Sequence, residues 1–120
     1  TLKDASGNNS VAISTVYSGS AKVWSGVATT SATAGDNFNI SSLVDDATGR
    51  TSHNFTSALT NTDFIAVYGA RSGGISDAYV NDYNATDRTT SKNTSQAQAA
   101  STGGFADITY ASMAIHGDLA

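Results

Sequence analysis

The sequence predicts an all-β protein, an antiparallel β-sandwich of jelly-roll type or a small barrel, from three observations. Apolar and polar side chains alternate with a period of two, and helical periodicity is nearly absent. The predicted strands are short, and turns rich in Gly, Asn and Asp separate them. The chain has no Pro and no Cys, so its turns use other residues and it has no disulfides. Evenly spaced short strands of this kind are typical of sandwiches and barrels.

The composition excludes several classes of protein. A chain of 120 residues is one domain, and 39% of its residues are hydrophobic. Its net charge is −4, so it lacks the basic face that binds nucleic acid or an anionic membrane. No apolar run approaches the ~20 residues that span a bilayer, so no membrane insertion is expected. The chain begins with Thr1, which indicates a processed chain or part of a longer one.

The chain divides into two parts. Residues 1–20 are expected to form a lead-in arm, and residues 21–120 a single β-sandwich domain. In the arm, Val11, Ile13 and Tyr17 are apolar side chains that could dock on a neighbour.

The first predicted strands are residues 21–27 and a hairpin that follows them. In residues 21–27, Val23 and Trp24 face opposite sides. The hairpin consists of a strand over residues 37–44, a turn at residues 45–49 and a returning strand. One face of its first strand is expected to carry Phe38, Ile40, Ser42 and Val44, and one face of the returning strand Thr51, His53 and Phe55.

Strands are also predicted at residues 62–71, 77–83 and 107–117. Residues 84–100 are polar throughout and are expected to form an exposed strand or an ordered loop, with a short Gln/Ala helix possible at the end. The strand at 62–71 has two largely apolar faces, Phe64, Ala66 and Tyr68 on one and Ile65, Val67 and Gly69 on the other. The strand at 107–117 has the faces Ala111, Met113, Ile115 and Tyr110, Ser112, Ala114, His116.

A strand with two apolar faces must be covered twice. The simplest second cover is another copy of the chain, which by closed symmetry forms a homo-oligomer. The alternative is that both strands are central in one sandwich and that loops cover them. The candidate subunit-interface residues are Phe64, Tyr68, Tyr110 and His116.

No catalytic, metal-binding or cofactor-binding residues are expected. His53 and His116 are more simply strand histidines, because no nucleophile motif accompanies them. The aspartates at 45, 46, 77, 82 and 87 are oxygen ligands of the kind that Ca²⁺ accepts, but they do not form a calcium-loop pattern.

Exposed aromatic and amide side chains are candidates for contact with a receptor glycan or protein. Tyr79 and Tyr83 could stack on sugar rings, and Asn81 and Asn84 lie beside them in sequence. For Trp24 and Tyr68, a place in the core is the alternative. The candidate contact loops are residues 72–76, 81–87 and 101–104.

Four segments carry a resemblance to a known family: AKVW, DNFNISSLVDDATGRTSHNFTSAL, TDFIAVYG and DITYASMAIHGD. They resemble a domain that recurs in tail-fibre and other virion proteins of tailed bacteriophages. The matching positions are residues 21–24, 37–45, 54–56 and 110–117, and LKDASGNN is similar to a segment that often precedes the domain. The sequence departs from the family at SGVATT after Trp24 and at Thr51 and His53, where the family has apolar residues. Residues 71–106 have no firm match.

The resemblance implies a non-enzymatic structural protein on the extracellular face of a virion. Its sandwich would be intertwined or packed as a homotrimer, would contact other virion proteins, and would contribute to attachment to the host surface. The alternatives are a capsid decoration or head-fibre protein that stabilises the shell, and a bacterial surface adhesin or extracellular filament subunit.

Overall fold

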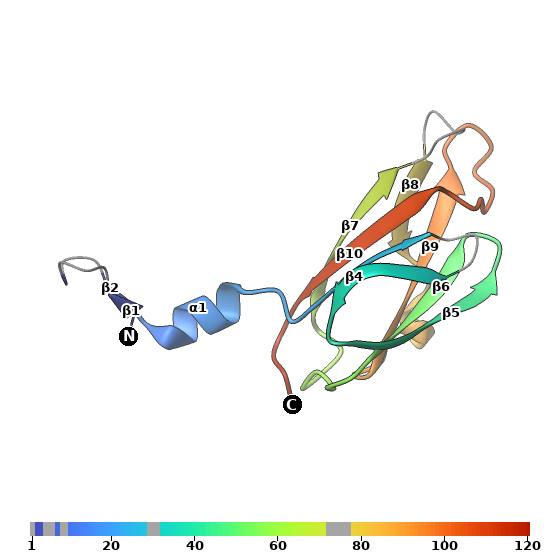
Figure 1. The fold of residues 1–120 in the computed structure, drawn as a ribbon. Helices are drawn as coiled ribbons and strands as arrows, with labels where there is room; N and C mark the ends of the chain where they lie inside the picture. The colour runs from blue at the N-terminus through green and yellow to red at the C-terminus, as the bar shows by residue number, and fades with distance from the viewer. Residues whose placement is uncertain (1, 4–6, 8–9, 29–31, 72–77) are drawn as a thin grey trace.

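The computed structural model describes residues 2–3, 7, 10–28, 32–71 and 78–120. Two four-stranded antiparallel sheets pack face to face, which confirms the predicted all-β sandwich (Figure 1). The strands form two separate sheets and not one closed barrel. The first sheet has the order β4-β3-β10-β7, with β3 (Val23–Ala28), β4 (Thr33–Phe38), β7 (Ile65–Arg71) and β10 (Tyr110–His116). The second has the order β5-β6-β9-β8, with β5 (Ile40–Ala47), β6 (Arg50–Phe55), β8 (Ala78–Asp82) and β9 (Lys92–Ala99).

The chain changes sheets at Asn39, where the sequence had predicted one continuous strand over residues 37–44. Asn39 has a φ of 58° and separates β4 from β5. Asn adopts this left-handed conformation more readily than most residues, and its side-chain amide donates to the carbonyl oxygens of Lys22 and Ser57 at 3.1 and 3.0 Å. The prediction that Phe38 and Ile40 share a strand face is therefore wrong, because they belong to different sheets.

The hairpin of β5 and β6 is confirmed, with a turn at Thr48 and Gly49. Gly49 has a φ of 70°, and a Cβ atom there would lie 2.6 Å from a backbone oxygen, so the turn requires glycine. An irregularity in the β5–β6 register between Ile40 and Ser42 shifts the strand, so that Leu43 packs against the core and Val44 is exposed. Thr51, His53 and Phe55, which were predicted to share one face of the returning strand, are all buried.

Residues 84–100 differ most from the sequence prediction. After a short 3₁₀ helix, η1 (Ala85–Asp87), they form β9, which pairs with both β6 and β8. Three consecutive polar residues of β9 are buried, Asn93, Thr94 and Ser95. Their polarity had indicated exposure, and the Gln/Ala helix is absent from this described segment, which is a strand.

The core consists of two apolar clusters joined by polar side chains. The first cluster contains Val23, Phe55, Leu59, Phe64, Met113 and Ile115. The second contains Val27, Ala97, Ile108 and Ala111. On β3, the buried Ser25 lies between the two clusters, and on β6 the fully buried His53 lies next to it. The centre of the sandwich is therefore held by hydrogen bonds, and apolar packing holds its two ends.

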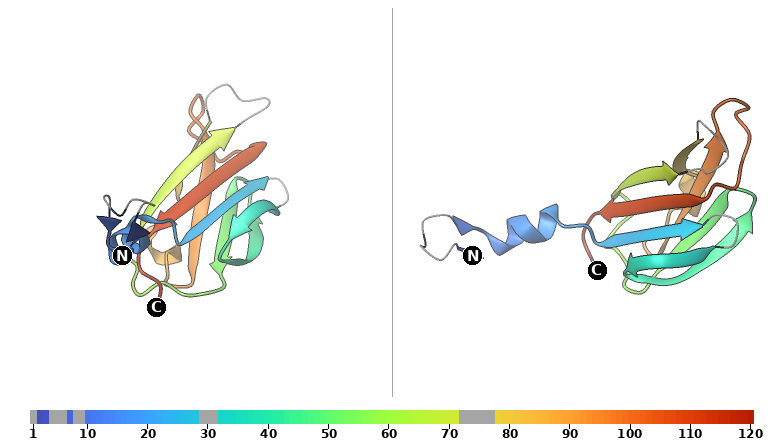
Figure 2. Two further views of the ribbon diagram at one scale, coloured as in Figure 1. Left: turned by 60° about the vertical axis from the view of Figure 1, so that its left-hand side comes forward. Right: turned by 45° about the horizontal axis from the view of Figure 1, so that its top comes forward.

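The N-terminal residues project away from the sandwich (Figure 2). They include the short strands β1 (Leu2–Lys3) and β2 (Ser10–Val11) and the helix α1 (Ile13–Gly19), which was not predicted. Seven residues are too few for helical periodicity to be recognised, and none of them is buried. The hydroxyl oxygen of Tyr17 accepts a hydrogen bond from the backbone N–H of Leu119 at 3.2 Å, which ties the helix to the sandwich. In the described part of the chain, no helix has the length and apolar character to cross a bilayer.

Candidate functional site

The outer face of the first sheet is apolar. Five large side chains on it are exposed, and we call them the apolar face: Trp24 (40%), Phe38 (50%), Ile65 (66%), Val67 (56%) and Tyr110 (41%). An antiparallel sheet that faces water normally carries polar side chains on that side. Large exposed apolar patches mark sites of interaction with other molecules.

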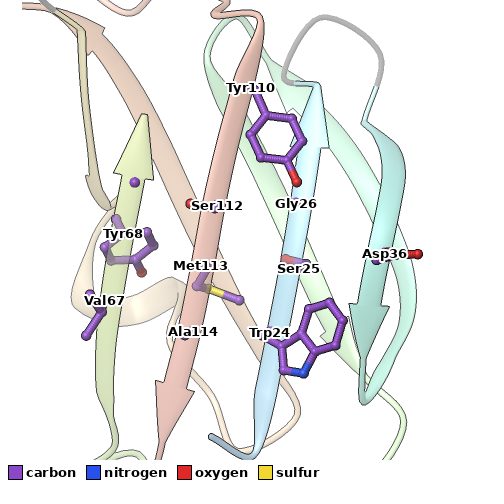
Figure 3. A pocket seen from close by; sticks show the side chains of 11 residues that line it. Trp24, Ser25, Gly26, Asp36, Val67, Tyr68, Tyr110, Ser112, Met113 and Ala114 are labelled. Atoms are coloured by element: carbon purple, nitrogen blue, oxygen red, sulfur yellow. The ribbon is translucent and has the colours of Figure 1, made fainter. Parts of the chain in front are cut away.

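A shallow groove of about 410 Å³ runs across the apolar face (Figure 3). Trp24, Val67 and Tyr110 form its walls, and small residues such as Gly26 and Gly69 form its floor. A Cβ atom on Gly26 would lie only 1.5 Å from the Tyr110 hydroxyl, so the tyrosine ring lies directly over this glycine. The groove therefore depends on a small residue beneath a large one.

The four predicted interface residues do not share one face. Tyr110 lies on the apolar face, and His116 is half-buried opposite Ile65. Phe64 is buried in the core at 3% exposure, and Tyr68 is partly buried against that core although it also contributes to the lining of the groove. The alternation of side chains along the sequence correctly separated the two faces of β7, but it did not reveal which face points into the core.

Tyr68 belongs to a polar network inside the sandwich. Its hydroxyl donates to the carboxylate of Asp82, and the Asn93 amide donates to the Tyr68 oxygen at 2.6 Å and to Asp82 at 3.0 Å. Burial and the neighbouring Asp82 raise the pKa of Tyr68, so the phenol stays protonated. Trp24, in contrast, lies on the outer side of its sheet and is not a core residue.

The outer face of the second sheet is polar and contains a groove of about 230 Å³, which we call the polar groove. Ser52 and Thr94 form its floor, with their hydroxyl oxygens 2.9 Å apart. The Ser52 hydroxyl also donates to the carboxylate of Asp46 at 2.6 Å. Lys92 and Asp87 contribute an ion pair of 3.4 Å to the lining.

Two aromatic rings and a guanidinium group lie at the polar groove. The rings of Tyr83 and Phe105 meet edge to face at a centroid distance of 6.2 Å. The Arg50 guanidinium lies 4.5 Å from the Tyr83 ring centroid and 5.8 Å from that of Phe105. The Arg50 Nε atom is buried and meets no hydrogen-bond acceptor among the described residues.

The structure brings three of the four predicted receptor-contact residues to this face. Tyr79, Asn81 and Tyr83 occupy alternate positions along and just after β8, so their side chains point the same way. Tyr79 and Asn81 are exposed, and Tyr83 lines the polar groove. Asn84 instead caps η1, because its side-chain oxygen accepts the N–H groups of Thr86 and Asp87.

Two of the candidate contact loops differ in whether they lie among the described residues. Residues 72–76 lie outside the described residues, and residues 101–104 are exposed. Arg50 and Lys92 of the groove, and Phe105 beside it, had not been identified from the sequence, and Asp46 had been considered only as a Ca²⁺ ligand. They are spread over three segments of the chain, which meet through the pairing of β5 with β6, the pairing of β6 with β9 and the bridge between Gln98 and Phe105.

His53 has a hydrogen-bonded arrangement that resembles part of a catalytic triad. Its Nδ1 lies 2.9 Å from the Ser25 hydroxyl, and its Nε2 lies 2.9 Å from the Ser95 hydroxyl. A triad requires a carboxylate on one ring nitrogen, whereas serines occupy both here. His53 is 1% exposed and Ser25 3%, so the arrangement joins the two sheets away from solvent.

Three of the aspartates considered for Ca²⁺ have other partners, since Asp46 accepts a hydrogen bond from Ser52 and the other two form ion pairs. Asp82 pairs with Arg88 at 3.2 Å, and Asp87 pairs with Lys92. Asp77 lies outside the described residues. Within those residues, no group of three or more His, Cys, Asp or Glu side chains could hold a metal ion.

The sandwich thus carries an apolar groove on one outer face and a polar, aromatic-lined groove on the other. The two grooves differ in chemistry, so they suit different partners. Comparisons of this chain with protein-family models, with curated proteins and with solved structures found no match.

Proposed function

We propose that this chain is a non-enzymatic structural protein of a bacteriophage virion, a tail-fibre or fibre-like component that contributes to attachment to the host surface. The observation that carries the proposal is the apolar face, a set of five large exposed side chains on one sheet. A protein that works as part of an assembly needs such a surface, because burying it provides the free energy of association. The resemblance of four chain segments to the virion domain supports the same function.

Self-association would bury the apolar face. The resemblance favours a homotrimer, and closed symmetry allows each copy to present the same groove to its neighbour. Other virion proteins are further partners, and the exposed Ile13, Val16 and Tyr17 of the N-terminal arm are available to them.

Attachment would use the outer face of the second sheet. Tyr79, Asn81 and Tyr83 lie on this face, which is on the opposite side of the sandwich from the apolar face, so assembly leaves it accessible. Weak contacts repeated over three subunits and several fibres give strong attachment through avidity.

Two measurements test the proposal. Antibody labelling of purified particles is expected to place the chain at the tail, and labelling over the capsid surface would favour a shell-stabilising decoration protein instead. The purified protein is expected to bind host cells, and the Tyr83→Ala variant to lose that binding. Val44→Thr is the matched control, because Val44 is exposed on β5 outside the polar groove. Absence of the chain from virions would overturn the proposal.

A further inference from the structure

We infer that the polar groove is a binding site for a neutral carbohydrate, and that it takes one sugar residue of a surface glycan. This inference rests on the proposed attachment function and names the class of receptor. The residues that carry it are Asp46, Arg50, Ser52, Tyr83, Asp87, Lys92 and Thr94.

The charges of the polar groove balance, which decides the class of ligand. Two cationic groups, Arg50 and Lys92, face two carboxylates, Asp46 and Asp87. Both carboxylates would repel an anionic ligand, and both cationic groups would repel a cationic ligand. A sugar hydroxyl both donates and accepts hydrogen bonds, so a polyhydroxylated neutral ligand can satisfy groups of either kind.

The hydrogen-bonding capacity of the groove is only partly used within the protein. The Asp46 carboxylate accepts from the Ser52 hydroxyl, and a carboxylate has further lone pairs. The Arg50 guanidinium stacks on Tyr83, and its buried Nε meets no acceptor among the described residues. A buried donor without an acceptor is costly, so a ligand oxygen at this position would be stabilised.

The size and the walls of the groove also suit a sugar. Its volume of about 230 Å³ is below the roughly 300–1,000 Å³ of pockets for drug-sized ligands. Tyr83 and the half-exposed Phe105 give it an apolar edge on which the C–H surface of a sugar ring can pack. One ring of a chain would enter, and its neighbours would extend along β8 towards Asn81 and Tyr79.

The test uses a glycan array that carries neutral hexose oligosaccharides, uronic-acid oligosaccharides and phosphorylated oligosaccharides. The wild-type chain is expected to bind members of the neutral set. Arg50→Gln, which removes the charge and the fork of donors, is expected to weaken that binding about tenfold. Asp87→Asn is expected to weaken it as well, whereas Val44→Thr should leave it unchanged.

A structural readout separates binding at the groove from loss of folding. In a ¹⁵N-correlation spectrum, the neutral oligosaccharide is expected to shift the amide signals of Ser52, Thr94 and Tyr83, while the dispersed spectrum of each variant shows that it is folded. Binding of only acidic glycans, or shifts that lie away from these residues, would overturn the inference.

The failure of this inference and that of the proposed function are distinguishable. If the array shows no neutral-glycan binding but Tyr83→Ala still abolishes adsorption to host cells, attachment stands and the neutral-sugar assignment is wrong. If the chain binds neutral glycans but is absent from virions, the sugar site stands and the virion function is wrong.

Discussion

The Ser25 hydroxyl on β3 lies 2.9 Å from Nδ1 of His53 on β6, so a buried hydrogen bond joins the two sheets of the sandwich. The other ring nitrogen of His53 meets the Ser95 hydroxyl of β9 at the same distance. Desolvation by burial lowers the pKa of His53 to about 4, although the Asp46 carboxylate acts in the opposite direction. The neutral imidazole is therefore part of the folded core.

This lowered pKa predicts a loss of stability in mild acid. Between pH about 6.5 and about 4 the unfolded chain binds a proton at this histidine that the folded chain does not, so stability falls as the pH falls through this range. A shift of this size corresponds to about 3 kcal/mol of unfolding free energy. Denaturant unfolding at pH 7, 5.5 and 4.5 measures it.

Two variants separate His53 from the other titrating groups. His53→Gln should remove this part of the pH dependence, at the cost of lower stability at pH 7. His116→Gln should retain it, because this variant leaves the buried His53 and its two serine partners unchanged. An unchanged pH profile in His53→Gln would contradict the role of this histidine.

The network around Tyr68 predicts a second effect on stability. Tyr68→Phe leaves the partly exposed Asp82 and the buried Asn93 without the phenol hydroxyl, so the unfolding free energy should fall by about 1–3 kcal/mol. Tyr79→Phe is the matched control, because Tyr79 also donates to a side chain, Gln98, but on the exposed face. Equal losses of unfolding free energy in the two variants would argue against a stabilising role for the Tyr68 network.

The contact between Gly26 and Tyr110 predicts a change in assembly with little change in folding. In Gly26→Ala the new Cβ must displace the Tyr110 ring, which can move because it is partly exposed. We expect an unfolding free energy within about 1 kcal/mol of wild type, together with weaker self-association in sedimentation experiments.

Two comparisons check the Gly26 prediction. Gly35→Ala should leave association intact, because a Cβ there meets its nearest atom at 3.7 Å. In a Tyr110→Ala background, Gly26→Ala should have no further effect on association. An equal further loss in that background would show that Gly26 does not act through Tyr110.

Much of the fold follows from the sequence because strand alternation is clear where one face is apolar. Val23 and Trp24 were correctly assigned to opposite faces of β3, and Thr51 was correctly placed on the same face of β6 as His53 and Phe55, a face that is buried in the structure. The corner at Asn39 could not be predicted, because a single residue in the left-handed conformation interrupts the alternation without a Gly or Pro to mark it.

The polar interior explains the other differences. Residues of β9 such as Asn93 and Ser95 are buried because their partners, Tyr68 and His53, come from distant segments. Hydrogen bonds of this kind depend on which strands meet, and local composition does not encode that. The polar groove is similar, since Arg50 and Tyr83 lie far apart in sequence and meet only across the folded sheet.

The outward residues of β7 give the most direct test of the assembly claim. Native mass spectrometry of the wild-type chain at micromolar concentration should report a homotrimer. Val67→Ser, which replaces a 56% exposed apolar side chain on the groove wall, should shift the chain to monomer and leave it folded. A monomeric wild-type chain, or a Val67→Ser variant that remains a trimer, would contradict assembly through the apolar face.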